Sequence, residues 1–203
     1  MNIPSGNPYN FSPVITNNRI VATKGGIGTI YASDGQWAKN VSGGVISGNV
    51  ILECDTSTEW INGIYNRYWN MTIIGNQING GYDGILNRGS YVDISHNRIS
   101  LTGRSGIRFY NSGTSMIKNI VNSNIILNVG DGDDDCIQLY DVYNSSISFN
   151  IGEGDSDGID ETGTCDYNIY IGNNMDCDDD DYDINSSNSK PATPADFNIG
   201  TFA

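Results

Sequence analysis

Carboxylates crowd the C-terminal part of this chain, where few positive charges offset them. Residues 126–203 hold 18 Asp and Glu against one Lys, whereas residues 1–125 hold 9 Lys and Arg against 6 acids. The acids fall mainly in three stretches, 131–135, 153–157 and 176–181. If folding brings these stretches together, repulsion disfavours joint ionisation, so pKa values rise or a hard cation binds. The sequence therefore predicts a Ca²⁺ site with the ligands Asp133, Asp134, Asp155, Asp178 and Asp180. The alternative is that these acids form a stack of loops in contact with water and bind no ion.

The charge and hydropathy of the chain disfavour two classes of partner. A net charge of −14 repels nucleic acid and anionic membrane surfaces, and it attracts cations. No apolar run approaches 18 residues, so we expect no membrane insertion.

A repeat that ends in Asn places the acidic stretches relative to one another. Apolar residues alternate before each Asn, as in Val92-Asp93-Ile94-Ser95-His96-Asn97, and the spacings between successive Asn residues are 27, 21, 27, 26 and 23. Repeats of this length predict a solenoid in which each copy forms one coil. The repeated residues are Asn49, Asn76, Asn97, Asn124, Asn150 and Asn173, with a final partial copy at Phe197–Gly200.

A second motif, Gly-Ile or Cys-Ile, lies between successive Asn positions. It is followed by alternating residues, as in Ile107-Arg108-Phe109-Tyr110, which indicates a strand with one face inward. Each coil then supplies about three short strands that pair with the next coil. The fold class predicted is all-β, a single-stranded parallel β-helix of about seven coils. Residues 1–40 form the N-terminal cap and first coil, and residues 41–203 form the repeats of one structural domain.

The repeated Asn residues resemble the asparagine ladder of pectate-lyase-like right-handed parallel β-helix proteins. A stacked Asn side chain can satisfy backbone groups that a tight turn would leave without partners. The resemblance covers about residues 40–200 and implies a right-handed β-helix whose outer face contacts polysaccharide.

Two outward rows follow the Gly-Ile motif and combine aromatic rings with guanidinium groups. We expect them to form a bed for an anionic sugar chain beside the acidic edge, although exposed strand positions favour large side chains in any case. The predicted substrate-binding residues are Tyr65, Arg67, Arg88, Tyr110, Gln138 and Tyr140.

Two short segments, Ser156–Asp160 and Asp133–Ile137, resemble motifs of the polygalacturonase-type glycoside hydrolases. The resemblance implies paired carboxylates that act as general acid and base around a water. The chain departs from the family in three ways. The second motif lies in an earlier coil than the first, which is the wrong order. A later copy stands in the right order, but Tyr182 replaces its Cys, and the family's later motifs are missing. A lyase or epimerase, in which a cation neutralises a uronate carboxylate and an Arg or Tyr takes the proton, needs fewer groups. The candidate catalytic residues are Asp135, Asp157, Asp160 and Arg108.

The four Cys residues of this Asn-rich chain fit an oxidising compartment. Cys54 lies about three coils from Cys136, too far for a bridge, whereas Cys136, Cys165 and Cys177 lie on neighbouring coils. The predicted disulfide joins Cys165 to Cys177, and Cys54 or a coil end is left for self-association.

Together these patterns predict an extracellular or cell-surface β-helix that binds polysaccharide, with Ca²⁺ and with lyase- or hydrolase-like activity as further expectations. The alternative is a non-catalytic structural or adhesive surface module, such as a segment of a surface layer, filament or phage fibre.

Overall fold

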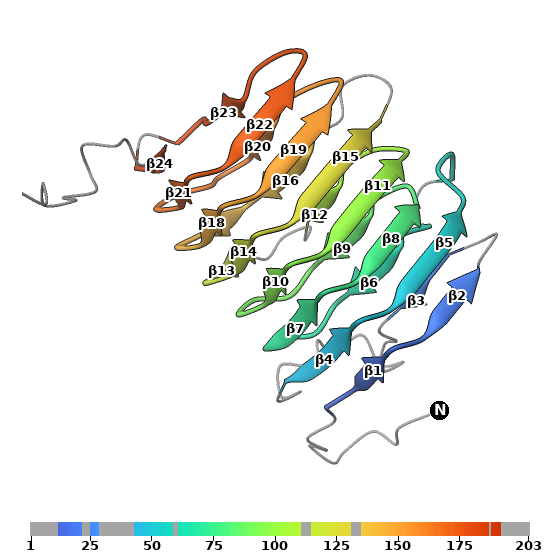
Figure 1. Cartoon of the computed structure of the whole chain (residues 1–203). Coiled ribbons are helices and arrows are strands. Elements are labelled where there is room, and N and C mark those ends of the chain that lie inside the picture. The colour runs from blue at the N-terminus through green and yellow to red at the C-terminus, as the bar shows by residue number, and fades with distance from the viewer. Residues whose placement is uncertain are drawn as a thin grey trace, which may run out of the picture.

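The computed structural model describes residues 12–21, 25–28, 43–58, 61–110, 115–130, 135–186 and 188–191. Every regular element in these ranges is a β-strand. The described residues contain no helix that is long and apolar enough to cross a membrane. The strands stack in rising order along one axis from β1 to β24, as Figure 1 shows.

Three parallel sheets run along this axis, and each takes one strand from each coil. Sheet 1 contains β1 (Val14–Thr16), β4 (Gly44–Ser47), β7 (Met71–Ile74), β10 (Asp93–Ser95), β14 (Ile120–Asn122), β18 (Ser146–Ser148), β21 (Ile169–Ile171) and β24 (Lys190–Pro191). Sheet 2 contains β2 (Arg19–Val21), β5 (Val50–Cys54), β8 (Gln77–Gly80), β11 (Arg98–Thr102), β15 (Ile125–Val129), β19 (Ile151–Gly154) and β22 (Asn174–Cys177). Sheet 3 contains β3 (Ile27–Gly28), β6 (Ile64–Asn66), β9 (Ile85–Asn87), β12 (Ile107–Phe109), β16 (Ile137–Tyr140), β20 (Ile159–Thr162) and β23 (Tyr182–Asp183).

The chain visits the three sheets in the same order in every coil. Coil 1 is β1, β2 and β3, coil 7 is β21, β22 and β23, and β24 begins a further coil. The short strands β13 (Met116–Ile117) and β17 (Val142–Tyr143) pair beside sheet 1. The predicted all-β fold, a right-handed parallel β-helix, is confirmed. The first coil lies within the predicted cap region, whereas Phe197–Gly200 lies outside the described residues.

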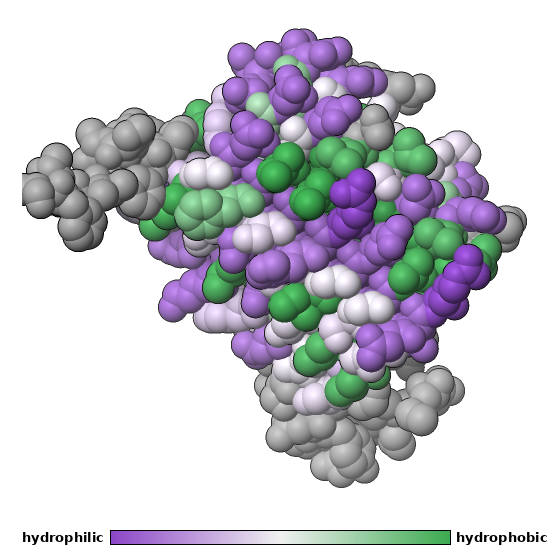
Figure 2. All heavy atoms as spheres, viewed as in Figure 1, coloured by the Kyte–Doolittle hydropathy of each residue, from purple (hydrophilic) through white to green (hydrophobic). Residues whose placement is uncertain are grey.

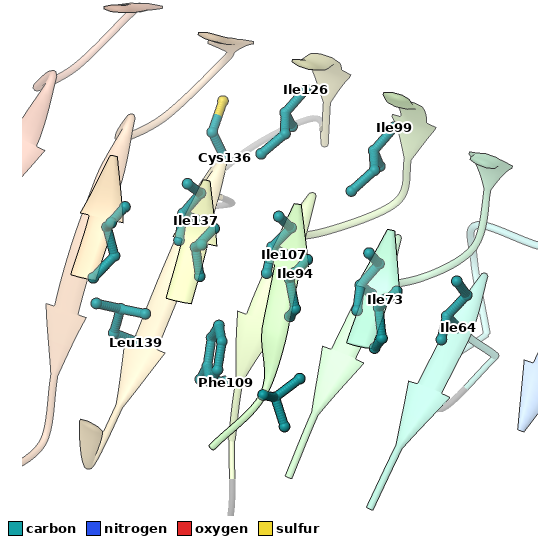
Figure 3. Close-up of a cluster of buried hydrophobic side chains, with 14 of the residues drawn as sticks. Ile64, Ile73, Ile94, Ile99, Ile107, Phe109, Ile126, Cys136, Ile137 and Leu139 are labelled. Carbon is teal, nitrogen blue, oxygen red and sulfur yellow. The ribbon is translucent and has the colours of Figure 1, made fainter. Parts of the chain in front are cut away.

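Equivalent apolar residues lie directly over one another in the core. In sheet 3 the column runs through Ile64, Ile85, Ile107, Ile137 and Ile159, which are paired coil to coil and are all fully buried. Sheets 1 and 2 contribute similar columns, and Figure 3 shows side chains from the three sheets meeting between the strands. No coil can bury its own apolar residues, so stacking supplies the hydrophobic stabilisation.

The repeated Asn residues form one continuous column at the corner between sheets 1 and 2, as predicted. Each Asn from Asn18 to Asn150 donates from its Nδ2 to the Oδ1 of the next Asn at 2.9–3.0 Å, and its backbone N–H donates to the same oxygen at 3.0 Å. From Asn49 to Asn173, Nδ2 also donates to a sheet 1 carbonyl of the preceding coil at 2.9–3.0 Å. The ladder therefore replaces the water that the turn amides would otherwise need. Asn18 is a member that the sequence repeat did not predict.

A second polar column, which was not predicted, lies where the chain enters sheet 1 in the C-terminal coils, just before β14, β18, β21 and β24. The backbone N–H of Asn119 donates to Ser145 Oγ, that of Ser145 to Asn168 Oδ1, and that of Asn168 to Ser189 Oγ, at 3.0–3.1 Å. Because Ser and Asn alternate here, no single residue type repeats along the sequence to mark the corner.

Removing one rung of the ladder should destabilise the whole rod. Asn97→Ala deletes two donated and two accepted hydrogen bonds in a side chain that is 1% exposed. It leaves buried backbone groups unsatisfied, so we expect a loss of about 3 kcal/mol in the free energy of unfolding, measured with urea. Asn79→Ala is the control, because that half-buried side chain makes one bond of 3.4 Å. Equal losses in the two variants would contradict a structural role of the ladder.

Candidate functional site

The outward side of sheet 3 carries the two predicted rows in adjacent positions. Strand pairing aligns Tyr65, Leu86, Arg108, Gln138 and Asp160 across five coils, and it continues to Asp183. The neighbouring row contains Arg67, Arg88, Tyr110, Tyr140 and Thr162. We call these two rows, with Asp135 and Asp157 at the adjoining turn, the sheet 3 face. All six predicted substrate-binding residues lie on it.

Guanidinium groups and tyrosine rings alternate along the N-terminal half of the sheet 3 face. The Arg88 guanidinium carbon lies 5.7 Å from the Tyr65 ring centre and 5.4 Å from that of Tyr110. Arg108 approaches the Tyr110 ring to 4.5 Å, and the Tyr110 and Tyr140 ring centres are 5.2 Å apart. Attraction between cations and ring faces stabilises this arrangement. Arg88 is buried at 8% exposure, whereas the other rings and guanidinium groups of the two rows are half-buried.

The positive charges at this end of the face are held close together. Burial, and then the neighbouring charge of Arg88, lowers the pKa of Arg67 to about 10. Burial also lowers the pKa of Arg108, with the Arg104 charge as the next cause. A bound anion would relieve this repulsion, so the arrangement favours an anionic ligand.

Gln138 joins the basic half of the face to the acidic half. Its Oε1 accepts from Arg108 Nε at 2.6 Å, and its Nε2 donates to Asp135 Oδ2 at 2.9 Å and to Asp160 Oδ2 at 3.4 Å. The amide therefore has one orientation only, because its oxygen must face the guanidinium and its nitrogen the two carboxylates.

Three carboxyl groups at the acidic half have raised pKa values. Burial raises the pKa of Asp135 to about 7, and the charges of Asp160 and Asp157 add to the effect. Burial is also the largest cause of the raised pKa values of Asp157 and Asp160. The Thr162 hydroxyl donates to Asp160 and opposes the shift there. A carboxyl that titrates near neutrality can exchange a proton with a ligand at physiological pH.

One group of acids among the described residues converges closely enough to hold a cation. One carboxylate oxygen from each of Asp157, Asp160 and Asp183 lies within 4.8 Å of the others. Hard cations take such oxygen ligands, and binding would offset the mutual repulsion of the three groups. We call these residues the aspartate triad.

The metal ligands predicted from the sequence differ from the aspartate triad. Asp155, Asp178 and Asp180 are exposed and do not belong to it, and Asp133 and Asp134 lie outside the described residues. The prediction followed the density of acids along the chain, whereas side-chain direction decides which carboxylates meet. Asp183 was missed because Tyr182 replaces the Ile that marks this strand, although its register with Asp160 was the available signal.

The structure also corrects the predicted disulfide between Cys165 and Cys177. The Cys165 thiol is directed at the Leu139 carbonyl, 3.3 Å away, and accepts from the Val142 amide at 3.4 Å. The Cys177 thiol lies beside Cys136 instead, at 3.7 Å. All four cysteines are free thiols. The sequence argument counted coils but not the direction of each side chain.

Comparisons with protein-family models, curated proteins and solved structures found no match to this chain.

The raised pKa of Asp135 makes a prediction about stability. The unfolded carboxyl ionises near pH 4 and the folded one near pH 7, so its contribution to stability is fully present below pH 4 and is lost as the pH rises to about 7. Asp135→Asn has no carboxyl to ionise, so it does not lose this stability as the pH rises. Between pH 4 and pH 8 its free energy of unfolding should rise by about 2 kcal/mol relative to that of the wild type. The gain is smaller than the full pKa shift implies, because water near the half-buried neighbouring acids weakens the effect.

Denaturant titrations at several pH values would measure this gain. Asp55→Asn is a control of opposite sign, because donation from the Ser57 amide and hydroxyl lowers the pKa of Asp55. Parallel curves for the wild type and Asp135→Asn would contradict the raised pKa.

Proposed function

We propose that the sheet 3 face binds an anionic polysaccharide that carries uronate groups. The observation that supports this most is the alternation of guanidinium groups and tyrosine rings over consecutive coils. Tyrosine rings stack on the apolar faces of sugars, and guanidinium groups pair with carboxylates in a bidentate manner. The rows from Tyr65 to Asp183 span five coil spacings, about 24 Å, which suits an extended chain rather than a single sugar.

The acidic half of the face needs a bound cation if it is to contact the same polysaccharide. Ionised carboxylates of the aspartate triad would repel a uronate, whereas a bound Ca²⁺ would take oxygens from both. We therefore propose that Ca²⁺ bridges Asp157, Asp160 and Asp183 to the polymer. An extracellular or cell-surface location is part of the proposal, because such polymers and millimolar Ca²⁺ are found there.

Retention on immobilised polygalacturonate would test the proposal. Arg108→Gln should lower the affinity roughly tenfold, because it removes one charged contact worth about 1.5 kcal/mol. Arg98→Gln is the matched control, since Arg98 is exposed on sheet 2, away from the sheet 3 face. Equal retention of the two variants would contradict the proposal that the sheet 3 face binds the polysaccharide.

The same column separates the role of the cation. A chelator should weaken retention of the wild type, and Asp183→Asn should bind weakly with or without Ca²⁺. Retention that the chelator leaves unchanged would rule out the Ca²⁺ bridge but would leave the Arg-dependent binding in place.

Cleavage of the bound chain is a second candidate function, favoured by the raised pKa of Asp135. A carboxyl that is protonated near pH 7 and linked through Gln138 to Arg108 could donate a proton to a leaving oxygen. Asp157 and Asp160, also predicted as catalytic, lie next to it and could act as the base.

Incubation with polygalacturonate would distinguish the forms of this activity. A lyase produces an unsaturated product that absorbs in the ultraviolet, and a hydrolase produces reducing ends only. Either activity should fall at least a hundredfold in Asp135→Asn, because general acid catalysis contributes about that factor or more. Binding without either product would leave a non-catalytic adhesive module, and absence of both binding and cleavage would favour the structural module.

A further inference from the structure

Two thiols that are 41 residues apart in sequence meet inside the C-terminal half of the rod. Cys136 Sγ and Cys177 Sγ are 3.7 Å apart. Cys136 comes directly before β16 in coil 5 and is fully buried, whereas Cys177 ends β22 in coil 7 and is half-buried. Neither residue belongs to the sheet 3 face.

Glycines in the intervening coil make this contact possible. The sheet 2 column of Ile78, Ile99 and Ile126 continues at Gly152, where the side chain is absent. Met175 and the Cys136 thiol share the vacated space, because a Cβ on Gly152 would lie 2.4 Å from Met175 Sδ and 2.9 Å from Cys136 Sγ. A Cβ on Gly154 would lie 3.3 Å from Cys136 Sγ. Figure 3 shows the Cys136 side chain in the core beside Ile126. Gly154 pairs with Cys177 in register, so the two sulfurs meet across a coil that has no side chain between them.

We propose that Cys136 and Cys177 form a reversible disulfide that joins coil 5 to coil 7 under oxidising conditions. The oxidant is an external disulfide, R–S–S–R. The Cys177 thiolate attacks it to give a mixed disulfide and one RSH, and the Cys136 sulfur then displaces the second RSH after losing its proton to water. The two thiols lose two electrons, which reduce the external disulfide to two thiols.

The exposure of the two thiols supports this order of attack. Cys177 is half-buried and can meet an external disulfide at the surface, whereas Cys136 is fully buried. The outer thiol therefore reacts first, and the buried thiol resolves the mixed disulfide.

The link would fasten the most strongly charged part of the molecule. Asp135 precedes Cys136, and Asp176 and Asp178 flank Cys177. Figure 2 shows that the end of the rod around β22 and β23 is mostly hydrophilic. Repulsion among these acids favours separation of the coils, and a covalent bond between coils 5 and 7 opposes it. This inference is independent of the proposed sugar binding.

Oxidation of the full chain with cystamine, a cationic disulfide that the acidic surroundings attract, would test the proposal. Peptide mapping without reductant should find Cys136 linked to Cys177, and the melting temperature should rise by about 10 °C over the reduced protein. Cys54→Ser and Cys165→Ser should keep both results, whereas Cys177→Ser should lose both. Each variant is compared with itself before and after cystamine, so a change in its basal stability does not affect the result.

Three outcomes would overturn the inference. They are four thiols that remain free or only singly capped by cystamine, a link that involves Cys54 or Cys165, and a Cys136–Cys177 link that leaves the melting temperature unchanged.

Discussion

The register between successive coils is the constraint on which every other feature of this rod depends. Each Asn of the ladder bonds to the Asn above it and to a carbonyl of the coil below, so one corner of every coil is held at a single height and angle. Because parallel strands then continue from that corner, residues with the same position in their coils lie over one another. The isoleucine columns of the core and the rows of the sheet 3 face are both consequences of this register.

Stacking converts a change of composition along the sequence into a change of charge along the rod. The face carries guanidinium groups and tyrosine rings in coils 2 to 4 and carboxylates in coils 5 to 7, with Gln138 bonded to both kinds of group at the boundary. The carboxylates are partly buried by one another's coils, which raises the pKa values of Asp135, Asp157 and Asp160. The neutral amide of Gln138 lies between the two kinds of charge, so Arg108 contacts Asp135 and Asp160 through Gln138.

The parts of the site that were predictable are those governed by the repeat. Tyr65, Arg67, Arg88, Tyr110, Gln138 and Tyr140 could be assigned to one face because strand alternation sends every second side chain outward. Where the repeat breaks, residues of the rod were missed. Tyr182 hid the strand that places Asp183 in the aspartate triad, and the inward position of sheet 3 in coil 6 holds the fully buried Glu161, which accepts from Asn168 and Tyr170 instead of continuing the apolar column.

Residue types and local spacing were enough to predict the coil, its Asn corner, the inward and outward alternation and the acidic C-terminal half. They were not enough to predict which carboxylates converge and which thiols meet. Those contacts depend on side-chain direction and on what fills the space between coils. The pairing of Cys177 with Cys136 rather than Cys165 shows the difference, since it arises from the absence of side chains at Gly152 and Gly154 in a coil that contains neither cysteine.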